Sequence, residues 1–161
     1  MGKTIEACIV IAQKWAEQKR KILIIVPANL KMQWQMELDE KFYISSIILD
    51  SESYKAYNRK ENVNPFVQDS VVIVSYNFAY EKADALKNIP WDLVVMDEAH
   101  KVRNAYKPDN VIGRTLLNAL QDRQKLLLTA TPLHNSIMEL YGLRVIFPDA
   151  IMDDAGGTTD E

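Results

Sequence analysis

Residues 93–100 read Leu-Val-Val-Met-Asp-Glu-Ala-His, an apolar run that ends in two adjacent carboxylates and a histidine. A short run of consecutive apolar residues predicts a strand that is buried on both faces. At its end, Asp97 can hold a magnesium ion through the ion's water shell, and Glu98 can polarise an attacking water molecule. The competing interpretation is a strand followed by an acidic helix start, in which a carboxylate caps backbone N–H groups. The stretch favours an ion-dependent hydrolytic site.

A second motif stands at the beginning of the chain. Gly2-Lys3-Thr4 matches the last part of the phosphate loop G-x-x-x-x-G-K-[ST]. In that loop, backbone N–H groups cradle phosphates, the lysine reaches the β- and γ-phosphates, and the hydroxyl binds magnesium. The apolar pattern that continues to residue 18 predicts a mostly buried helix whose N-terminus faces the phosphate. A disordered terminal lysine is the alternative interpretation of Lys3.

The two ends of the chain differ from its middle. The first glycine of the phosphate loop, and the strand that should precede it, do not stand before Gly2. Residues 151–161 lose the apolar pattern and read as a solvated tail. We therefore expect one domain over residues 1–150, a flexible tail over residues 151–161, and a chain that is a piece of a longer protein.

The composition bounds the class of protein. With 161 residues, of which 48% are hydrophobic, one domain with a sizeable core is expected. A net charge of -3 gives no global nucleic-acid signature, although a local basic face remains open. Cys8 lies in an apolar helical pattern and reads as a core residue rather than a nucleophile. Neither a signal peptide nor a membrane-spanning run is evident, so a reducing cytoplasmic or nuclear setting is expected. Candidates for the basic face are Lys31, Lys101, Arg103 and Lys107.

Short apolar strands alternate with helical segments along the chain. This order predicts an α/β fold with three layers, α/β/α, in which helices cover both faces of a mainly parallel central sheet. The expected strands are residues 21–27, 45–49, 71–76, 92–96 and 125–129. The expected helices are residues 30–41, 78–86, 110–120 and 137–147, with a polar helix and loop over residues 54–67.

Right-handed crossovers bring the carboxyl ends of parallel strands to one edge, where open α/β sheets bind ligands. Each turn expected there has an ordinary explanation, because proline ends strands, and Ser, Asn and Thr cap helices. Their joint placement with the helix start at Gly2 favours a ligand site. The turns are Pro27-Ala28-Asn29, Ser75-Tyr76-Asn77, Asp97-Glu98-Ala99-His100 and Thr129-Ala130-Thr131-Pro132.

Three motifs together resemble the first RecA-like lobe of superfamily 2, DEAH-box helicase-type ATPases, which are P-loop NTPases. They are Gly2-Lys3-Thr4, Asp97-Glu98-Ala99-His100 and residues 128–135, Leu-Thr-Ala-Thr-Pro-Leu-His-Asn. The continuation through Ser136 and Glu139-Leu140-Tyr141 is similar to the Swi/Snf-type branch, which moves along double-stranded DNA without separating it. Residues 100–104 point the same way, as do Val26-Pro27 with Trp34 and Glu37. The resemblance covers roughly residues 2–148.

The resemblance implies roles for individual residues. Gly2, Lys3 and Thr4 would bind ATP, with Lys3 on the β- and γ-phosphates and Thr4 on Mg²⁺. Asp97 would hold the ion through water, and Glu98 would orient and activate the hydrolytic water. The nucleotide state would be coupled to the DNA-facing side by His100, Thr129 and Thr131. The phosphate backbone of DNA, contacted without sequence preference and in a salt-sensitive way, would be touched by Pro27, Asn29, Ser75 and Tyr76.

The function that the resemblance implies is the N-terminal ATP-binding motor lobe of an ATP-dependent double-stranded DNA translocase that remodels or displaces proteins on DNA. ATP and Mg²⁺ would be its cofactors. Double-stranded DNA and a second RecA-like lobe of the same protein would be its partners, with no membrane involved. The second lobe supplies arginines that complete hydrolysis, and such an arginine contributes about 10³–10⁵ in rate. Without that lobe, the chain is expected to be nearly inactive.

Two other functions compete with this one. A strand-separating DNA or RNA helicase of the DEAH type is disfavoured by Leu133-His134-Asn135. A non-catalytic scaffold that binds DNA or protein is disfavoured because Lys3, Asp97 and Glu98 are all present. Short loops favour a bacterial or archaeal source, and hence a cytoplasmic, nucleoid-associated protein over a nuclear one.

Overall fold

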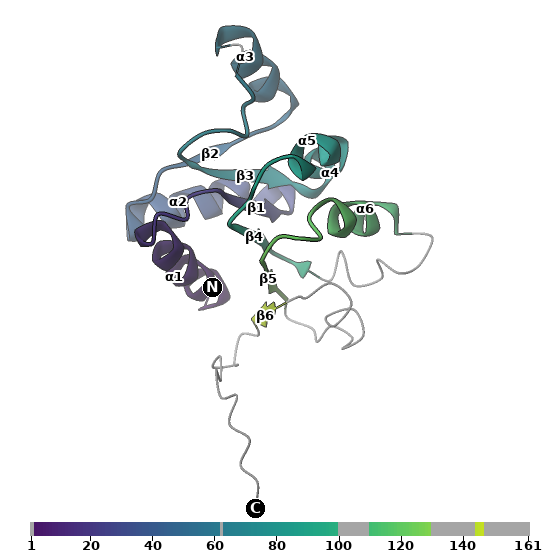
Figure 1. The fold of residues 1–161 in the computed structure, drawn as a ribbon. Coiled ribbons are helices and arrows are strands. Elements are labelled where there is room, and N and C mark those ends of the chain that lie inside the picture. Colours follow the sequence, from purple (N-terminus) through teal and green to yellow (C-terminus); the bar gives the residue numbers. More distant parts are fainter. Residues whose placement is uncertain (1, 62, 100–109, 130–143, 147–161) are drawn as a thin grey trace, which may run out of the picture.

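The computed structural model describes residues 2–61, 63–99, 110–129 and 144–146. Within these ranges, the chain forms a parallel sheet of six strands in the order β2-β3-β1-β4-β5-β6, with helices on both faces (Figure 1). This is the α/β/α fold with a parallel sheet that the sequence predicts. The strands are β1 Ile22–Val26, β2 Ser46–Ile48, β3 Val71–Ser75, β4 Leu93–Met96, β5 Lys125–Leu128 and β6 Arg144–Ile146.

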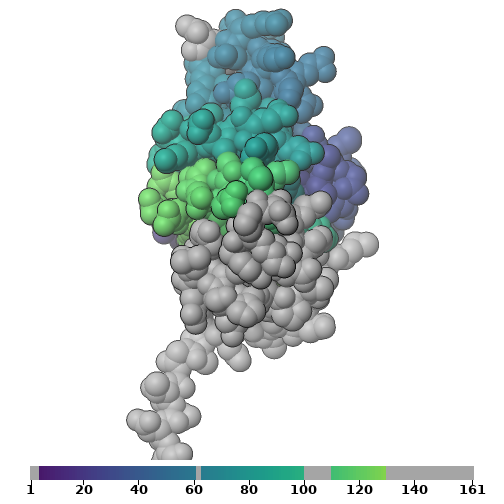
Figure 2. All heavy atoms as spheres, turned by 90° about the vertical axis from the view of Figure 1, so that its right-hand side faces the viewer, coloured from purple at the N-terminus to yellow at the C-terminus, as the bar shows by residue number. Residues whose placement is uncertain are grey.

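The helices divide into two layers. Helices α1 and α2 cover one face of the sheet, and α4, α5 and α6 cover the other (Figure 1). Figure 2 shows α4, α5 and α6 as one continuous surface of teal and green atoms. The helices are α1 Gly2–Ala16, α2 Lys31–Phe42, α3 Ser51–Glu61, α4 Tyr76–Glu81, α5 Ala83–Lys87 and α6 Val111–Ala119, with a 3₁₀ turn, η1, at Ala28–Leu30.

Strand β1 lies in the middle of the sheet and contributes side chains to both hydrophobic cores, one on each face of the sheet. Ile22, Ile24 and Val26 pack with α1 and α2, whereas Leu23 and Ile25 pack with the opposite layer. All five side chains are completely buried. Successive side chains of a strand point to opposite faces, so only a continuous apolar run can fill both cores. The run at residues 21–27 therefore predicts this strand correctly.

The strand register brings the predicted turns to one edge. Ile25 is paired with Met96 and Val26 with Ser75, so Pro27, Tyr76 and Asp97 follow directly at the carboxyl ends of three adjacent strands. Met96 is in turn paired with Leu127, so Thr129, two residues further on, follows directly after the neighbouring strand β5. The convergence at the carboxyl edge is confirmed for the described residues of these turns, which do not include residues 100 and 130–132.

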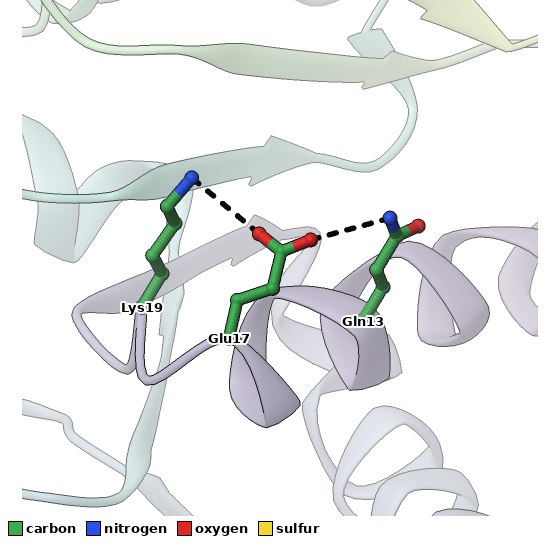
Figure 3. A network of polar contacts seen from close by, with 3 residues as sticks. All are labelled: Gln13, Glu17 and Lys19. Carbon is green, nitrogen blue, oxygen red and sulfur yellow. Dashed lines mark hydrogen bonds and ion pairs between the residues drawn. The ribbon is translucent and has the colours of Figure 1, made fainter.

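Helix α1 runs back along the sheet from that edge. It ends in a tight turn, where Gln18 has a φ of 66° and the backbone N–H of Lys19 donates to the Lys14 oxygen over 2.9 Å. Glu17 accepts from Gln13 over 3.3 Å and pairs with Lys19 over 3.4 Å (Figure 3). The exposed pair adds little stability. The turn leads straight into β1 and so places the C-terminal end of α1 at the amino edge of the sheet.

Several boundaries differ from the sequence predictions. Residue 76 is not the end of a strand, because the Ser75 hydroxyl accepts from the backbone N–H of Phe78 over 3.1 Å and starts α4 at Tyr76. The helix expected over residues 78–86 is two helices that meet at Lys82.

Helix α1 buries only one side, since Ile5 and Ile9 are 36% and 55% exposed. The prediction of a mostly buried helix there is wrong.

The last predicted helix, residues 137–147, is wrong where it can be compared. Residues 144–146 form β6, which pairs with β5 in parallel from Arg144 opposite Leu126 to Ile146 opposite Leu128. Val145 and Ile146 are β-branched and suit a strand. Residues 137–143 and 147, like the tail at 151–161, lie outside the described residues.

Candidate active site at the carboxyl edge of the sheet

Asp97 is the first residue after β4, and hydrogen bonds hold both its backbone and its carboxylate. Its backbone N–H donates to the Ile25 oxygen over 2.9 Å, which continues the strand pairing by one residue. Its Oδ1 accepts from the backbone N–H of Glu98 over 2.8 Å, and its Oδ2 accepts from the Trp34 indole N–H over 2.9 Å. The side chain is 2% exposed. The carboxylate therefore has a fixed orientation at the edge of the sheet.

Both helical layers contribute to this arrangement. Trp34 comes from α2 on one face, and Tyr76 comes from the start of α4 on the other. The Tyr76 hydroxyl donates to the backbone oxygen of Asp97 over 2.6 Å. Burial raises the pKa of Tyr76 well above its usual value, and the charges of Asp97 and Glu98 raise it further. The phenol thus stays protonated and remains a donor at neutral pH.

Glu98 takes an unusual backbone conformation. Its φ of 54° lies in the left-handed region, which costs a residue with a side chain about 1 kcal/mol or more. The conformation turns the chain out of the strand direction and aims the Glu98 N–H at Asp97. Glu98 is half-buried, whereas Asp97 is almost completely enclosed. The two adjacent carboxylates therefore occupy different environments, as two different roles would require.

The start of α1 lies at the same edge of the sheet. Because α1 ends at the amino edge and its 15 residues span about 22 Å, its first turn reaches back to the carboxyl edge, as Figure 1 shows. The helix packs against β4 and β5, and Thr4 in its first turn is buried. The side chain of Lys3 lies outside the described parts. That Lys3 faces Asp97 and Glu98 across a cleft stays a prediction.

The residues expected to couple the site to DNA are only partly described. Thr129 follows β5 and is completely buried, next to the strand that carries Asp97. His100 and Thr131 lie outside the described residues. The coupling roles of all three stay predictions.

The four residues expected to contact DNA lie at this edge but differ in exposure. Asn29 is exposed on η1, and Pro27, which precedes that turn, is half-buried. Ser75 is half-buried and caps α4, whereas Tyr76 is 5% exposed and directs its hydroxyl at Asp97. Of the basic candidates, Lys31 is half-buried at the start of α2, and Lys101, Arg103 and Lys107 lie outside the described residues. DNA contact by these residues stays a prediction.

Sequence reasoning missed the two side chains that hold Asp97. Trp34 enters the sequence analysis only through the resemblance, and Tyr76 only as a DNA-facing residue. A buried indole or phenol needs a hydrogen-bond partner, so the residue types carry a signal that a partner exists. The partner itself is 63 positions away from Trp34 and 21 from Tyr76, so only the folded chain identifies it.

The chain is similar to known proteins over most of its length. The SNF2-related domain family matches residues 1–154. The chain is 36% identical over 146 residues to the "Uncharacterized ATP-dependent helicase YqhH" of Bacillus subtilis, covering 89% of this chain and 24% of that protein. It is 37% identical over 137 residues to the "RNA polymerase-associated protein RapA" of Pectobacterium carotovorum, covering 82% of this chain and 14% of that protein.

A solved structure shows the same fold. The SWI2/SNF2 ATPase core of Sulfolobus solfataricus, in complex with dsDNA, aligns with 87% of this chain and 28% of that chain at a TM-score of 0.61 and 19% identity. The chain thus spans a quarter or less of the two bacterial relatives. Among the described helices, none is long and apolar enough to cross a membrane. The family match extends over nearly the whole sequence, and the chain therefore belongs to the SNF2-related domain family.

Proposed function

We propose that this chain is the N-terminal ATP-binding motor lobe of an ATP-dependent double-stranded DNA translocase, which remodels or displaces proteins on DNA. The observation that carries the proposal is Asp97, a buried carboxylate fixed at the carboxyl edge of a parallel sheet. The relatives include a protein named as an ATP-dependent helicase. Use of ATP is therefore a property of the family, and motion along duplex DNA is our proposal.

Magnesium fits the donors that this edge offers. Within the described residues, no three His, Cys, Asp or Glu side chains gather into a metal cage. Mg²⁺ suits such a site, because it keeps several waters and uses one or two protein oxygens together with substrate phosphates. We assign the Thr4 hydroxyl and, through water, the Asp97 carboxylate to the ion. When bound, the ion neutralises charge that develops on the transferred phosphoryl group.

The remaining residues have distinct tasks. The backbone at Gly2 and the ammonium group of Lys3 bind the β- and γ-phosphates, while Glu98 orients the water that attacks the γ-phosphate. Of the two carboxylates, Glu98 is the better placed to meet a water molecule, because it is only half-buried whereas Asp97 is enclosed. His100, Thr129 and Thr131 couple the nucleotide state to the DNA-facing side. Pro27, Asn29, Ser75 and Tyr76 belong to the segments that touch the DNA backbone.

The complete motor needs a second RecA-like lobe, which supplies arginines for the transition state. We propose that residues 1–150 act with that lobe in one polypeptide, that the isolated chain is nearly inactive, and that residues 151–161 are a flexible tail. The protein works in the cytoplasm of a bacterium or archaeon, on the nucleoid.

The test uses the full-length protein that carries this lobe, with ATP and Mg²⁺. Blunt duplex DNA should stimulate ATP hydrolysis, and the protein should displace the third strand of a triplex without unwinding the duplex itself. Separation of a blunt duplex into single strands would favour the DEAH-type helicase instead. Absence of ATP hydrolysis, with and without DNA, would leave the non-catalytic scaffold.

A further inference from the structure

The indole of Trp34 reaches across the fold to a carboxylate. The side chain is 1% exposed, and its Nε1 donates to Oδ2 of Asp97 over 2.9 Å. Trp91 offers an internal comparison, because its buried indole donates to the Leu86 oxygen over 3.1 Å, only five residues away. Trp91 thus satisfies its N–H locally, whereas Trp34 ties helix α2 to the end of strand β4.

The bond has an effect on Asp97 that packing alone would not have. Oδ1 of Asp97 accepts from the Glu98 backbone N–H, and Oδ2 accepts from Trp34. A carboxylate with a donor on each oxygen cannot rotate without breaking one of the two bonds. Both partners are enclosed, so water does not readily replace the indole, and a hydrogen bond to a charged group is strong in such surroundings.

We propose that Trp34 is a positioning residue for the magnesium site: its indole N–H fixes the plane of the Asp97 carboxylate. The inference deepens the proposed function and rests on it. A side chain that hydrogen-bonds to a metal-binding residue typically contributes 10- to 100-fold in metal affinity or activity. Here the carboxylate acts through water, so its orientation decides where that water sits.

Tyr76 supplies a second and independent anchor. Its hydroxyl donates to the backbone oxygen of Asp97, from the layer opposite Trp34. Trp34 therefore fixes the side chain of Asp97, and Tyr76 fixes its main chain. Tyr76 is a positioning residue of the same site.

The main test compares Trp34→Phe with Trp91→Phe in the full-length protein. Both changes remove one buried indole N–H and retain an aromatic ring, so both lower stability. Only Trp34→Phe should raise, by about 10-fold, both the Mg²⁺ concentration that half-saturates ATP hydrolysis and the Mg²⁺ concentration that half-saturates binding of a fluorescent, non-hydrolysable ATP analogue. The KM for ATP measured at saturating Mg²⁺ should change much less. An equal response of the two variants to Mg²⁺ would overturn the inference.

A second pair of variants covers the case in which Trp34→Phe does not fold. Tyr76→Phe should raise the half-saturating Mg²⁺ concentration several-fold. Tyr54→Phe, at a half-buried tyrosine whose ring packs at a tilt against Phe66, should leave it unchanged. Equal Mg²⁺ dependence of this pair would show that holding Asp97 in place does not set the affinity for Mg²⁺, and would overturn the inference in that case. A wild-type protein that hydrolyses no ATP would overturn the proposed function itself, which is a distinct result.

Discussion

The hydroxyl of Tyr76, the first residue after β3, lies 2.6 Å from the backbone oxygen of Asp97, the first residue after β4. Strand β1 separates these two strands in the sheet, so the bond joins the ends of strands that are not neighbours. It closes the carboxyl edge from one side, as Trp34 does from the other. The candidate site is therefore supported by both helical layers.

The first prediction concerns the energy of this bond. Tyr76→Phe should lower the free energy of unfolding by about 1–2 kcal/mol, because it leaves the buried oxygen of Asp97 without this donor. Tyr80→Phe, at a tyrosine that is 38% exposed, should change it by less than about 0.5 kcal/mol. Urea unfolding followed by tryptophan fluorescence measures both. Equal effects of the two substitutions would show that the Tyr76 bond contributes nothing specific.

The second prediction concerns Lys125, at the start of β5. Its side chain is 1% exposed, and its Nζ donates to the backbone oxygens of Gln121 and Arg123 over 3.2 and 2.9 Å. Burial lowers the pKa of Lys125 from 10.5 to about 8, with Arg123 lowering and Asp122 raising it. Between these two values, the unfolded chain binds the proton that the folded chain has lost. The stability contributed by this group should therefore rise with pH across that window.

The measurement is the difference in unfolding free energy between wild type and Lys125→Met. From pH 7.5 to 10.5 this difference should shift in favour of the wild type by roughly 2–3 kcal/mol, since one pKa unit corresponds to about 1.4 kcal/mol. Lys87→Met, at an exposed lysine on α5, is the matched control and is measured over the same pH range. A flat difference for Lys125→Met would mean that the lysine keeps its ordinary pKa in the folded protein.

The third prediction concerns the proposed contact with DNA. Asn29 is exposed on η1, directly before the helix that carries Trp34. Asn29→Ala should weaken the binding of duplexes of any sequence by several-fold, because a lost phosphate contact carries no sequence information. Asn118→Ala, at an exposed position of α6, serves as the matched control. Fluorescence anisotropy with two unrelated duplexes at one salt concentration distinguishes the outcomes, and unchanged affinity would remove Asn29 from the interface.

The sequence predicts the sheet well because its central strands are buried on both faces. Continuous apolar runs such as residues 71–74 are typical of strands that helices cover on both faces, as in the middle of an α/β sheet. Cys8, expected to be a core residue, is completely buried, and burial raises its pKa to about 12. The ends of helices and strands are harder to predict, since the capping by Ser75 and the division of the helix at Lys82 depend on local hydrogen bonds.

The candidate site, too, is predicted only in part from the sequence. The position of Asp97 at the carboxyl edge follows from the end of an apolar run, which the sequence displays. The left-handed φ of Glu98 and the indole at Oδ2 of Asp97 follow from contacts between distant segments. No pattern within residues 93–100 indicates either. The error at residues 144–146 has a related cause, since a short apolar stretch fits a helix or a strand equally until its neighbour is known.

The most direct measurement of the central claim is ATP hydrolysis by the full-length protein with Glu98→Gln. The amide keeps the shape of the side chain but cannot act on the attacking water, so hydrolysis should fall by about 100-fold or more while ATP still binds. Glu40→Gln, at an exposed glutamate of α2, should hydrolyse ATP at the wild-type rate. Hydrolysis by Glu98→Gln at the wild-type rate would contradict the assignment of this edge as the site of catalysis.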